Sequence, residues 1–224
     1  MCRLLAVKSD KEFDINYHLK KFSQIAKNSK EYQGDGWGCA YLKNGEWQIY
    51  KNIKPIWEQV HLIDNPEQFG KTTHLIAHAR SAFKNHPMKI ENNMPFYDGN
   101  YVFIFNGELH GVKIKESGNT GAEKIFNYIK RFNGNNILEA LKRGTELIKK
   151  RAKYIKAMNI IVSDKVCDYV ASMFNESPEY FTMYYKYAKN ELIICSEKYP
   201  GEEADSPDNW QKIGNNTIRE FTPQ

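Results

Sequence analysis

The order of predicted secondary-structure elements indicates an α+β fold in which two sheets pack together and helices lie outside them. Strand-like segments dominate the first half of the chain, two helical segments follow, and strand-like segments return in the last third. With 41% hydrophobic and 13% aromatic residues, 224 residues can fill a sizeable core. We find no internal repeat, low-complexity tract or linker, so we expect residues 1–224 to form a single domain.

The first half of the chain alternates apolar strands with one amphipathic helix. Residues 4–7 form an apolar run typical of a buried strand, and apolar residues recur at helical spacing from Asp14, a candidate N-cap, to Lys30. Asn44-Gly45 separates two strand-like runs, which is a strong signal for a type I′ hairpin. Further expected elements are a short helix over 55–63, a strand over 74–80, and a strand over 101–105 that ends at Asn106-Gly107.

The second half begins with two helices. Their expected ranges are 122–132 and 137–152, and Thr120 and Glu123 have the spacing of a capping box at the start of the first. The expected strands that follow cover 158–162, 169–174, 181–186, 192–196 and 218–221.

Composition excludes several classes of protein. The net charge is +5, but the basic residues are spread along the chain, and the densest run, 149–156, falls at a predicted helix end, where cations favour the helix dipole. We therefore expect no nucleic-acid partner. The four cysteines show no CxxC pairing and no metal-ligand spacing with the histidines, which is typical of reduced, cytoplasmic thiols. We see neither a signal peptide nor an apolar run approaching the ~18 residues of a membrane span, so we expect no membrane partner.

The chain begins Met1-Cys2, and this pair is the first candidate for chemistry. Cysteine is small enough for the initiator methionine to be removed, which leaves a thiol and an α-amine on one residue. The α-amine titrates near ~8 and the thiol near ~8.5, so the amine is able to accept the thiol proton. Cys2 is therefore a candidate nucleophile with its own base; position alone favours an ordinary core cysteine, so the rest of the sequence must supply the evidence for catalysis.

Three other stretches carry polar groups in suggestive places. Asn106-Gly107 offers a side-chain amide and a backbone N–H that are able to converge on an oxyanion, although the pair also fits an ordinary turn. Arg80 ends a predicted strand, where its guanidinium is suited to a carboxylate, and the alternative is a surface arginine. His78 shares a strand face with Arg80 or is a core histidine. The loop Asp35-Gly36-Trp37-Gly38 suits close approach to a ligand, or is a tight connection with a buried tryptophan.

In type and order, these segments resemble those of the stand-alone class II glutamine amidotransferases. The resemblance spans almost the whole chain and rests on the Cys2 terminus, Asp35-Gly36-Trp37-Gly38, His78-Ala79-Arg80, Asn92-Asn93-Met94-Pro95-Phe96, Phe105-Asn106-Gly107-Glu108-Leu109 and Asn159-Ile160-Ile161-Val162-Ser163-Asp164. It implies the N-terminal nucleophile (Ntn) hydrolase fold, a four-layer αββα sandwich of two mainly antiparallel sheets. It also implies that Cys2 attacks a side-chain amide, that ammonia leaves, and that a γ-glutamyl thioester is hydrolysed without a metal or organic cofactor.

Residue by residue, the resemblance implies that Asn106 and the Gly107 amide stabilise the oxyanion. It also implies that Arg80 binds the α-carboxylate of the substrate. The expected substrate site also includes His78, Asp35, Trp37, Glu108 and Gly121. Gly121 is a departure, because the family usually has an aspartate there that pairs with the α-ammonium of glutamine. Losing that partner costs ~3 to 5 kcal/mol, so either the substrate is not free glutamine or Asp35 or Glu108 reaches the amine. The loop that follows Arg80, residues 81–86 with His86 at its end, also differs from the family pattern.

The leading hypothesis is a cysteine amidohydrolase that acts on glutamine or a γ-glutamyl compound. Transfer of the ammonia would need a separate acceptor protein. One alternative is an amidase for an acyl amide that lacks a free α-amine. Another is a catalytically idle binding protein on the same fold.

Overall fold

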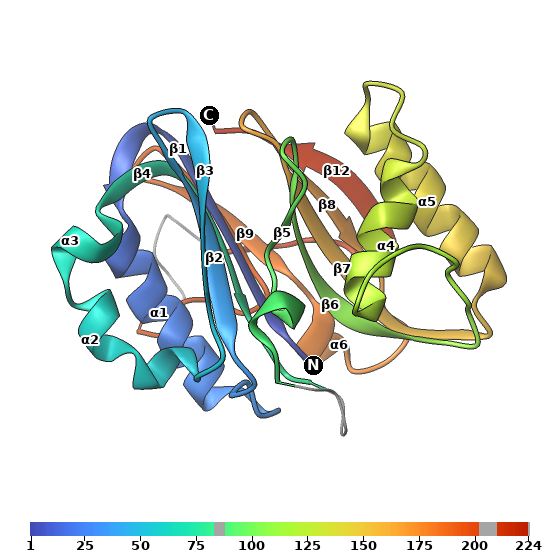
Figure 1. The fold of residues 1–224 in the computed structure, drawn as a ribbon, viewed down its shortest axis with the longest axis horizontal. Helices are drawn as coiled ribbons and strands as arrows, with labels where there is room; N and C mark the ends of the chain where they lie inside the picture. The colour runs from blue at the N-terminus through green and yellow to red at the C-terminus, as the bar shows by residue number, and fades with distance from the viewer. Residues whose placement is uncertain (83–87, 202–209, 224) are drawn as a thin grey trace.

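The computed structural model describes residues 1–82, 88–201 and 210–223. Two antiparallel sheets pack face to face, and helices cover the outer face of each (Figure 1). The predicted α+β class and the αββα order of layers are therefore confirmed.

The first sheet has seven strands, and β1 lies near its middle. Long helix α1 (Ile15–Asn28) covers its outer face together with the short helices η1 (Ile56–Glu58), α2 (Val60–Ile63) and α3 (Pro66–Phe69). The strand order is β11 (Gln211–Lys212), β9 (Tyr184–Ala188), β10 (Glu191–Cys195), β1 (Arg3–Asp14), β4 (Lys71–Ala79), β2 (Trp37–Lys43) and β3 (Glu46–Asn52).

The second sheet has five strands, with α4 (Gly121–Lys130) and α5 (Ile137–Arg151) on its outer face (Figure 1). Two further short helices, η2 (Ile90–Asn92) and α6 (Pro178–Phe181), lie in connections. The strand order is β12 (Thr217–Phe221), β8 (Asp168–Ser172), β7 (Tyr154–Ser163), β6 (Val102–His110) and β5 (Phe96–Tyr97).

Strand β1 is buried on both faces, and its alternation decides where Cys2 lies. Leu5 and Val7 pack in the cluster under α1, whereas Leu4 and Ala6 pack in the cluster that includes the second sheet. Because side chains alternate along a strand, Cys2 continues the face of Leu4 and Ala6. The start of the chain thus directs the thiol towards the second sheet.

Several local predictions are confirmed. Asp14 caps α1, its Oδ1 accepting from the Asn16 N–H at 2.9 Å. Asn44 and Gly45 have φ of 53° and 78°, the positive values that a type I′ turn requires. Thr120 caps α4 by accepting from the Glu123 N–H at 3.1 Å.

Other boundaries were wrong. Strand β6 does not end at Phe105 but continues through Asn106 and Gly107, which pair with Asn159 and Met158 of β7. The expected 181–186 strand starts only at Tyr184, because residues 178–181 form helix α6. The expected 55–63 helix is divided into η1 and α2. Strands β5 and β11 and helices α3 and α6 were not predicted.

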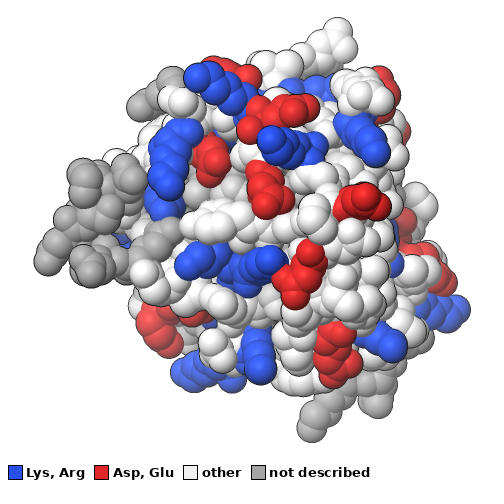
Figure 2. Space-filling view, turned by 90° about the vertical axis from the view of Figure 1, so that its left-hand side faces the viewer, with Lys and Arg blue, Asp and Glu red and all other residues white. Residues whose placement is uncertain are grey.

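The face on the α1 side carries basic and acidic side chains interspersed with one another (Figure 2). This mixture agrees with the spread of charge along the sequence. None of the described helices has the length and apolar composition needed to cross a membrane.

Candidate active site

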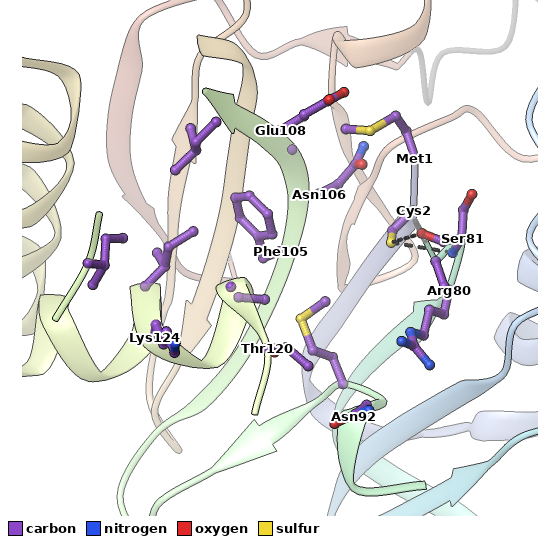
Figure 3. Close-up of a pocket in the computed structure, with 18 of the residues that line it drawn as sticks. Met1, Cys2, Arg80, Ser81, Asn92, Phe105, Asn106, Glu108, Thr120 and Lys124 are labelled. Atoms are coloured by element: carbon purple, nitrogen blue, oxygen red, sulfur yellow. Dashed lines mark hydrogen bonds between the residues drawn. The ribbon is translucent and has the colours of Figure 1, made fainter. Parts of the chain in front are cut away.

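Cys2 lies at the edge of the space between the sheets. Register pairing of Arg3 with Ala79 sets Cys2 opposite Arg80, just beyond the end of β4. The Ser81 N–H donates to Cys2 Sγ at 3.5 Å, and the thiol lies 3.7 Å from the Ser81 carbonyl oxygen (Figure 3). Burial raises the pKa of the Cys2 thiol, and this outweighs the lowering by the N-terminal ammonium, the Ser81 N–H and Arg80. The thiol therefore needs a base.

Met1 occupies a well-defined place next to Cys2. Its ammonium pairs with Glu31 Oε2 at 2.5 Å. Its carbonyl oxygen accepts from Gln33 Nε2 at 2.6 Å and from the Tyr180 hydroxyl. The oxygen of the same Gln33 amide is buried without a partner. Polar side chains thus hold both the ammonium and the carbonyl oxygen of Met1, the residue whose removal turns the Cys2 nitrogen into an α-amine.

Arg80 is a buried cation that lacks an acidic partner. Only 6% of the residue is exposed, and its guanidinium donates to the neutral Asn93 Oδ1 at 3.2 Å. Within the described part of the chain, Arg80 forms no ion pair with a carboxylate. A buried guanidinium favours an anion, and a carboxylate fits both of its arms. Arg80 is therefore suited to hold a carboxylate.

Asn106 and Gly107 both lie within β6, where Asn106 has a buried side-chain amide and Gly107 lies close to the backbone of β7. Asn106 is 1% exposed, and neither atom of its side-chain amide has a hydrogen-bond partner among the residues that the structure describes. Its side chain points towards Cys2 (Figure 3). A Cβ at Gly107 would lie 2.2 Å from the Ala157 carbonyl oxygen, so β6 and β7 approach too closely there for another residue. The buried amide of Asn106 is free to bind a ligand.

One cavity of about 470 Å³ joins these groups. Its lining includes six of the nine predicted site residues, namely Cys2, Arg80, Asn106, Gly107, Glu108 and Gly121. Apolar side chains from β6, α4 and the loop between them complete the wall, including Phe105, Leu109, Val112, Ile114 and Ile125. Among the described residues, a thiol, a side-chain amide without a hydrogen-bond partner and a guanidinium without an ion-pair partner thus share one cavity with an apolar wall.

The arrangement fits a known family. A model of the class-II glutamine amidotransferases matches residues 1–163. This chain belongs to that family. It is an enzyme of the amidotransferase type, with Cys2 in the position of the N-terminal cysteine.

Solved structures show the fold of this amidotransferase. A glutamine aminotransferase class-II domain protein from Silicibacter pomeroyi is 15% identical, with a TM-score of 0.59 over 99% of this chain and 100% of that one. A predicted glutamine amidotransferase from Pseudomonas aeruginosa is 14% identical, with a TM-score of 0.60 over 99% and 97%. Glutamine phosphoribosylpyrophosphate amidotransferase from B. subtilis is 13% identical, with a TM-score of 0.65 over 99% of this chain but only 49% of that enzyme. These likenesses show the Ntn-hydrolase fold; no curated protein sequence matches this chain.

Three predicted site residues of the amidotransferase lie outside the cavity lining. Asp35 Oδ2 accepts from the Ala82 N–H at 2.7 Å, so this carboxylate holds the backbone that follows Arg80. His78 is fully buried, and burial lowers its pKa to about 3, which keeps the imidazole neutral. Trp37 packs against Tyr50 and Phe69 in the cluster beneath α1, on the other side of the first sheet.

Glu108 and Gly121 reach the cavity but differ in what they offer. Glu108 is already paired with His110 Nε2 at 3.2 Å and lies 3.8 Å from Lys156 Nζ. Gly121 starts α4, and a Cβ built there would meet no atom within 4 Å. In the described ranges, no group of three His, Cys, Asp or Glu side chains is arranged to hold a metal ion.

Sequence reasoning missed Ser81, Gln33 and Tyr180. Ser81 acts through its backbone N–H, for which the sequence gives no signal, and Tyr180 comes from α6, far along the chain. Gln33 directly precedes the glycine-rich loop, and that position was its only signal. Residues 83–87, including His86, lie outside the described residues.

Proposed function

We propose that this amidotransferase hydrolyses the side-chain amide of glutamine or of a γ-glutamyl compound through a thioester on Cys2, releasing ammonia. The observation that supports this most is the shared cavity. The thiol of Cys2, the unpartnered amide of Asn106 and the unpaired guanidinium of Arg80 all line it. These are the nucleophile, the oxyanion donor and the carboxylate clamp that the reaction requires.

In the proposed mechanism, removal of Met1 frees the α-amine of Cys2. The amine accepts the thiol proton, and Sγ attacks the amide carbon. The amide of Asn106 and the N–H of Gly107 stabilise the oxyanion. The amine then returns the proton to the leaving nitrogen, the C–N bond breaks, and ammonia departs. Water hydrolyses the thioester, which restores the thiol and gives a carboxylate.

The substrate is oriented by its α-carboxylate on Arg80. The usual acid for the α-ammonium is absent at Gly121, and Glu108 is already paired with His110. Asp35 keeps one oxygen that the Ala82 N–H does not use, and we propose it as the remaining candidate for an amine. The ammonia would pass to an acceptor domain or an acceptor protein.

The experiment that tests this function is ammonia release from glutamine and from simple amides. The natural protein is compared with Cys2→Ala, and Cys167→Ala serves as the matched control, because Cys167 is a free thiol outside the cavity lining. Intact mass reports whether Met1 is removed. We expect turnover that disappears in Cys2→Ala and persists in Cys167→Ala. Turnover that survives in Cys2→Ala would rule out the proposal, and so would its absence from a trimmed natural protein.

A further inference from the structure

The side chain of Met1 fills an apolar space beside the reactive thiol. Met1 is 8% exposed and forms one buried cluster with Ala157, Phe174, Tyr180 and Phe181. It also lines the cavity that contains Cys2. In Figure 3 its side chain extends from the start of the chain past Asn106 towards Glu108. Removal of Met1 would therefore extend the cavity by an apolar space that borders Cys2 and Asn106.

The position of this space relative to Arg80 assigns it to one end of a substrate. Met1 and Arg80 lie on opposite sides of Cys2 (Figure 3). With the substrate carboxylate on Arg80 and the reacting carbon at Cys2 Sγ, the leaving nitrogen points away from Arg80. That nitrogen receives its proton from the α-amine of Cys2, so it must come within hydrogen-bond reach of this amine. In the untrimmed chain, the nitrogen of this α-amine is the Cys2 backbone nitrogen, which is bonded to Met1.

We propose that the space occupied by Met1 is the leaving-group subsite, and that it accepts an amine with an alkyl or aryl group of about the size of a methionine side chain. This proposal rests on the proposed function, since it concerns the same Cys2 reaction. The substrate class is then a γ-glutamyl amide whose nitrogen carries an apolar substituent. Sγ bonds to the carbonyl carbon of the side-chain amide, the C–N bond breaks, the thiol proton passes through the α-amine to the nitrogen, and a primary amine leaves. Water then converts the thioester to glutamate and restores the thiol.

The charges around the subsite restrict the leaving amine further. Glu31, which holds the Met1 ammonium at 2.5 Å, lies at one side of the space. Glu108, towards which the Met1 side chain extends, lines the cavity (Figure 3). Two nearby carboxylates repel a leaving group that has its own carboxylate. Amines without a carboxylate are therefore favoured over amino acids as leaving groups.

A series of substrates with lengthening substituents tests the subsite. Trimmed protein is assayed for glutamate release from glutamine, γ-glutamyl methylamide, propylamide, butylamide and benzylamide, and from γ-glutamyl glycine, which carries a carboxylate. We expect kcat/KM to rise about fourfold for each added methylene that the subsite buries, and γ-glutamyl glycine to lie below the methylamide. Glutamine turnover with a flat or falling alkylamide series would overturn the subsite alone. Failure of every substrate, glutamine included, would instead contradict the proposed function.

A substitution in the wall of the leaving-group subsite tests whether the preference for longer alkyl substituents arises there. Phe174→Ala enlarges the space, and Phe221→Ala is the control, because Phe221 is also a buried phenylalanine but lies on β12, where it packs against Tyr185. The measured quantity is the ratio of kcat/KM for butylamide to that for methylamide. We expect this ratio to fall several-fold in Phe174→Ala and to remain unchanged in Phe221→Ala. An unchanged ratio in Phe174→Ala would overturn the proposal, and Phe174→Leu replaces it if the alanine variant does not fold.

Discussion

The two ends of the space between the sheets differ in how their buried polar groups are satisfied. At the end away from Cys2, Oδ1 of Asp168 accepts from Ser163 and lies 2.9 Å from His74 Nε2, while its Oδ2 has no partner among the described residues, and Lys8 Nζ lies 3.4 Å from His74 Nδ1. At the Cys2 end, neither side-chain atom of Asn106 has a hydrogen-bond partner among the described residues, and His78 interacts with the backbone of Phe105 rather than with a charged side chain of the other sheet.

Strand β4 contributes to both ends, which makes the contrast informative. His74 and His78 lie on the same face of one strand, yet only His74 meets a charged partner from the other sheet. A buried polar group without a hydrogen bond costs about 1 to 3 kcal/mol, so such groups are retained where a ligand supplies the partner. The paired end is thus expected to contribute stability, and the unpaired end to contribute binding and catalysis.

The largest expected effect is on stability, at the paired end. Asp168→Asn leaves Lys8 and His74 buried without their anion, which is expected to lower the free energy of unfolding by about 3 to 5 kcal/mol. Urea unfolding measures the loss, and Asp10→Asn, at an exposed position of β1, is the control. A loss no larger than that of the control would mean that this network does not stabilise the fold.

The pH dependence of that loss follows from the pKa of Asp168. Burial raises this pKa, but the charge of His74 and the hydrogen bonds from His74 and Ser163 outweigh it and hold the pKa below its ordinary value. A lowered pKa gives stability that is present above the unfolded pKa of about 3.9 and is lost as the pH falls through the folded value. The difference between natural protein and variant should therefore be constant near neutral pH and should shrink below about pH 4.

The second prediction concerns the unpaired end, where we expect a substitution to lower activity rather than stability. Asn106→Ala removes one oxyanion donor and should lower kcat by about 10²- to 10³-fold. Because the Asn106 amide has no partner in the free protein, the free energy of unfolding should not fall as it does in a satisfied network. Steady-state kinetics and urea unfolding are measured together, with the exposed Asn28→Ala as control. A loss of stability at unchanged kcat would assign Asn106 a purely structural role.

The same contrast shows how far sequence reasoning extends. Patterns within one segment located β1, α1, the hairpin at Asn44-Gly45 and the cap at Thr120, because the signals of these elements are local. Asn106-Gly107 was taken to end a strand, since that dipeptide favours turns; pairing with Asn159 and Met158 overrides the local preference. The sequence does not reveal such pairing partners.

The site was predicted where a side chain carries its own chemistry. Cys2, Arg80 and Asn106 were selected for that reason, and the structure brings them to one cavity. Trp37 looked like a ligand contact but lies beneath α1, because the alternation of β2 turns it away from the cavity. Tyr180 was missed, because its contact with Met1 joins residues 179 positions apart.

The third prediction concerns the thiol itself. In the untrimmed chain, burial raises the pKa of Cys2, and the N-terminal ammonium that lowers it is one residue away. Removal of Met1 moves the ammonium onto Cys2, so the pKa falls, and alkylation by iodoacetamide at pH 7 should be about tenfold faster per unit of pKa. The two forms are separated by intact mass, and Cys167 serves as the internal control. Equal rates in both forms would show that the α-amine does not activate the thiol.

The smallest expected effect is on KM for glutamine, when a substitution places an acidic side chain at the unpaired end. A Cβ at Gly121 meets no atom within 4 Å, so Gly121→Asp should fit, and a carboxylate in the first turn of α4 is favoured by the helix dipole. Position 121 is exposed, so pairing with an α-ammonium should lower KM for free glutamine by only about two- to fivefold, with no gain for N-acetylglutamine. Gly134→Asp, where a Cβ also meets no atom within 4 Å but the cavity is not reached, is the matched control. If KM for glutamine does not change, another carboxylate already pairs with the α-ammonium of the substrate. Because Glu108 is paired with His110, we expect that carboxylate to be Asp35. Asp35→Asn should then raise KM.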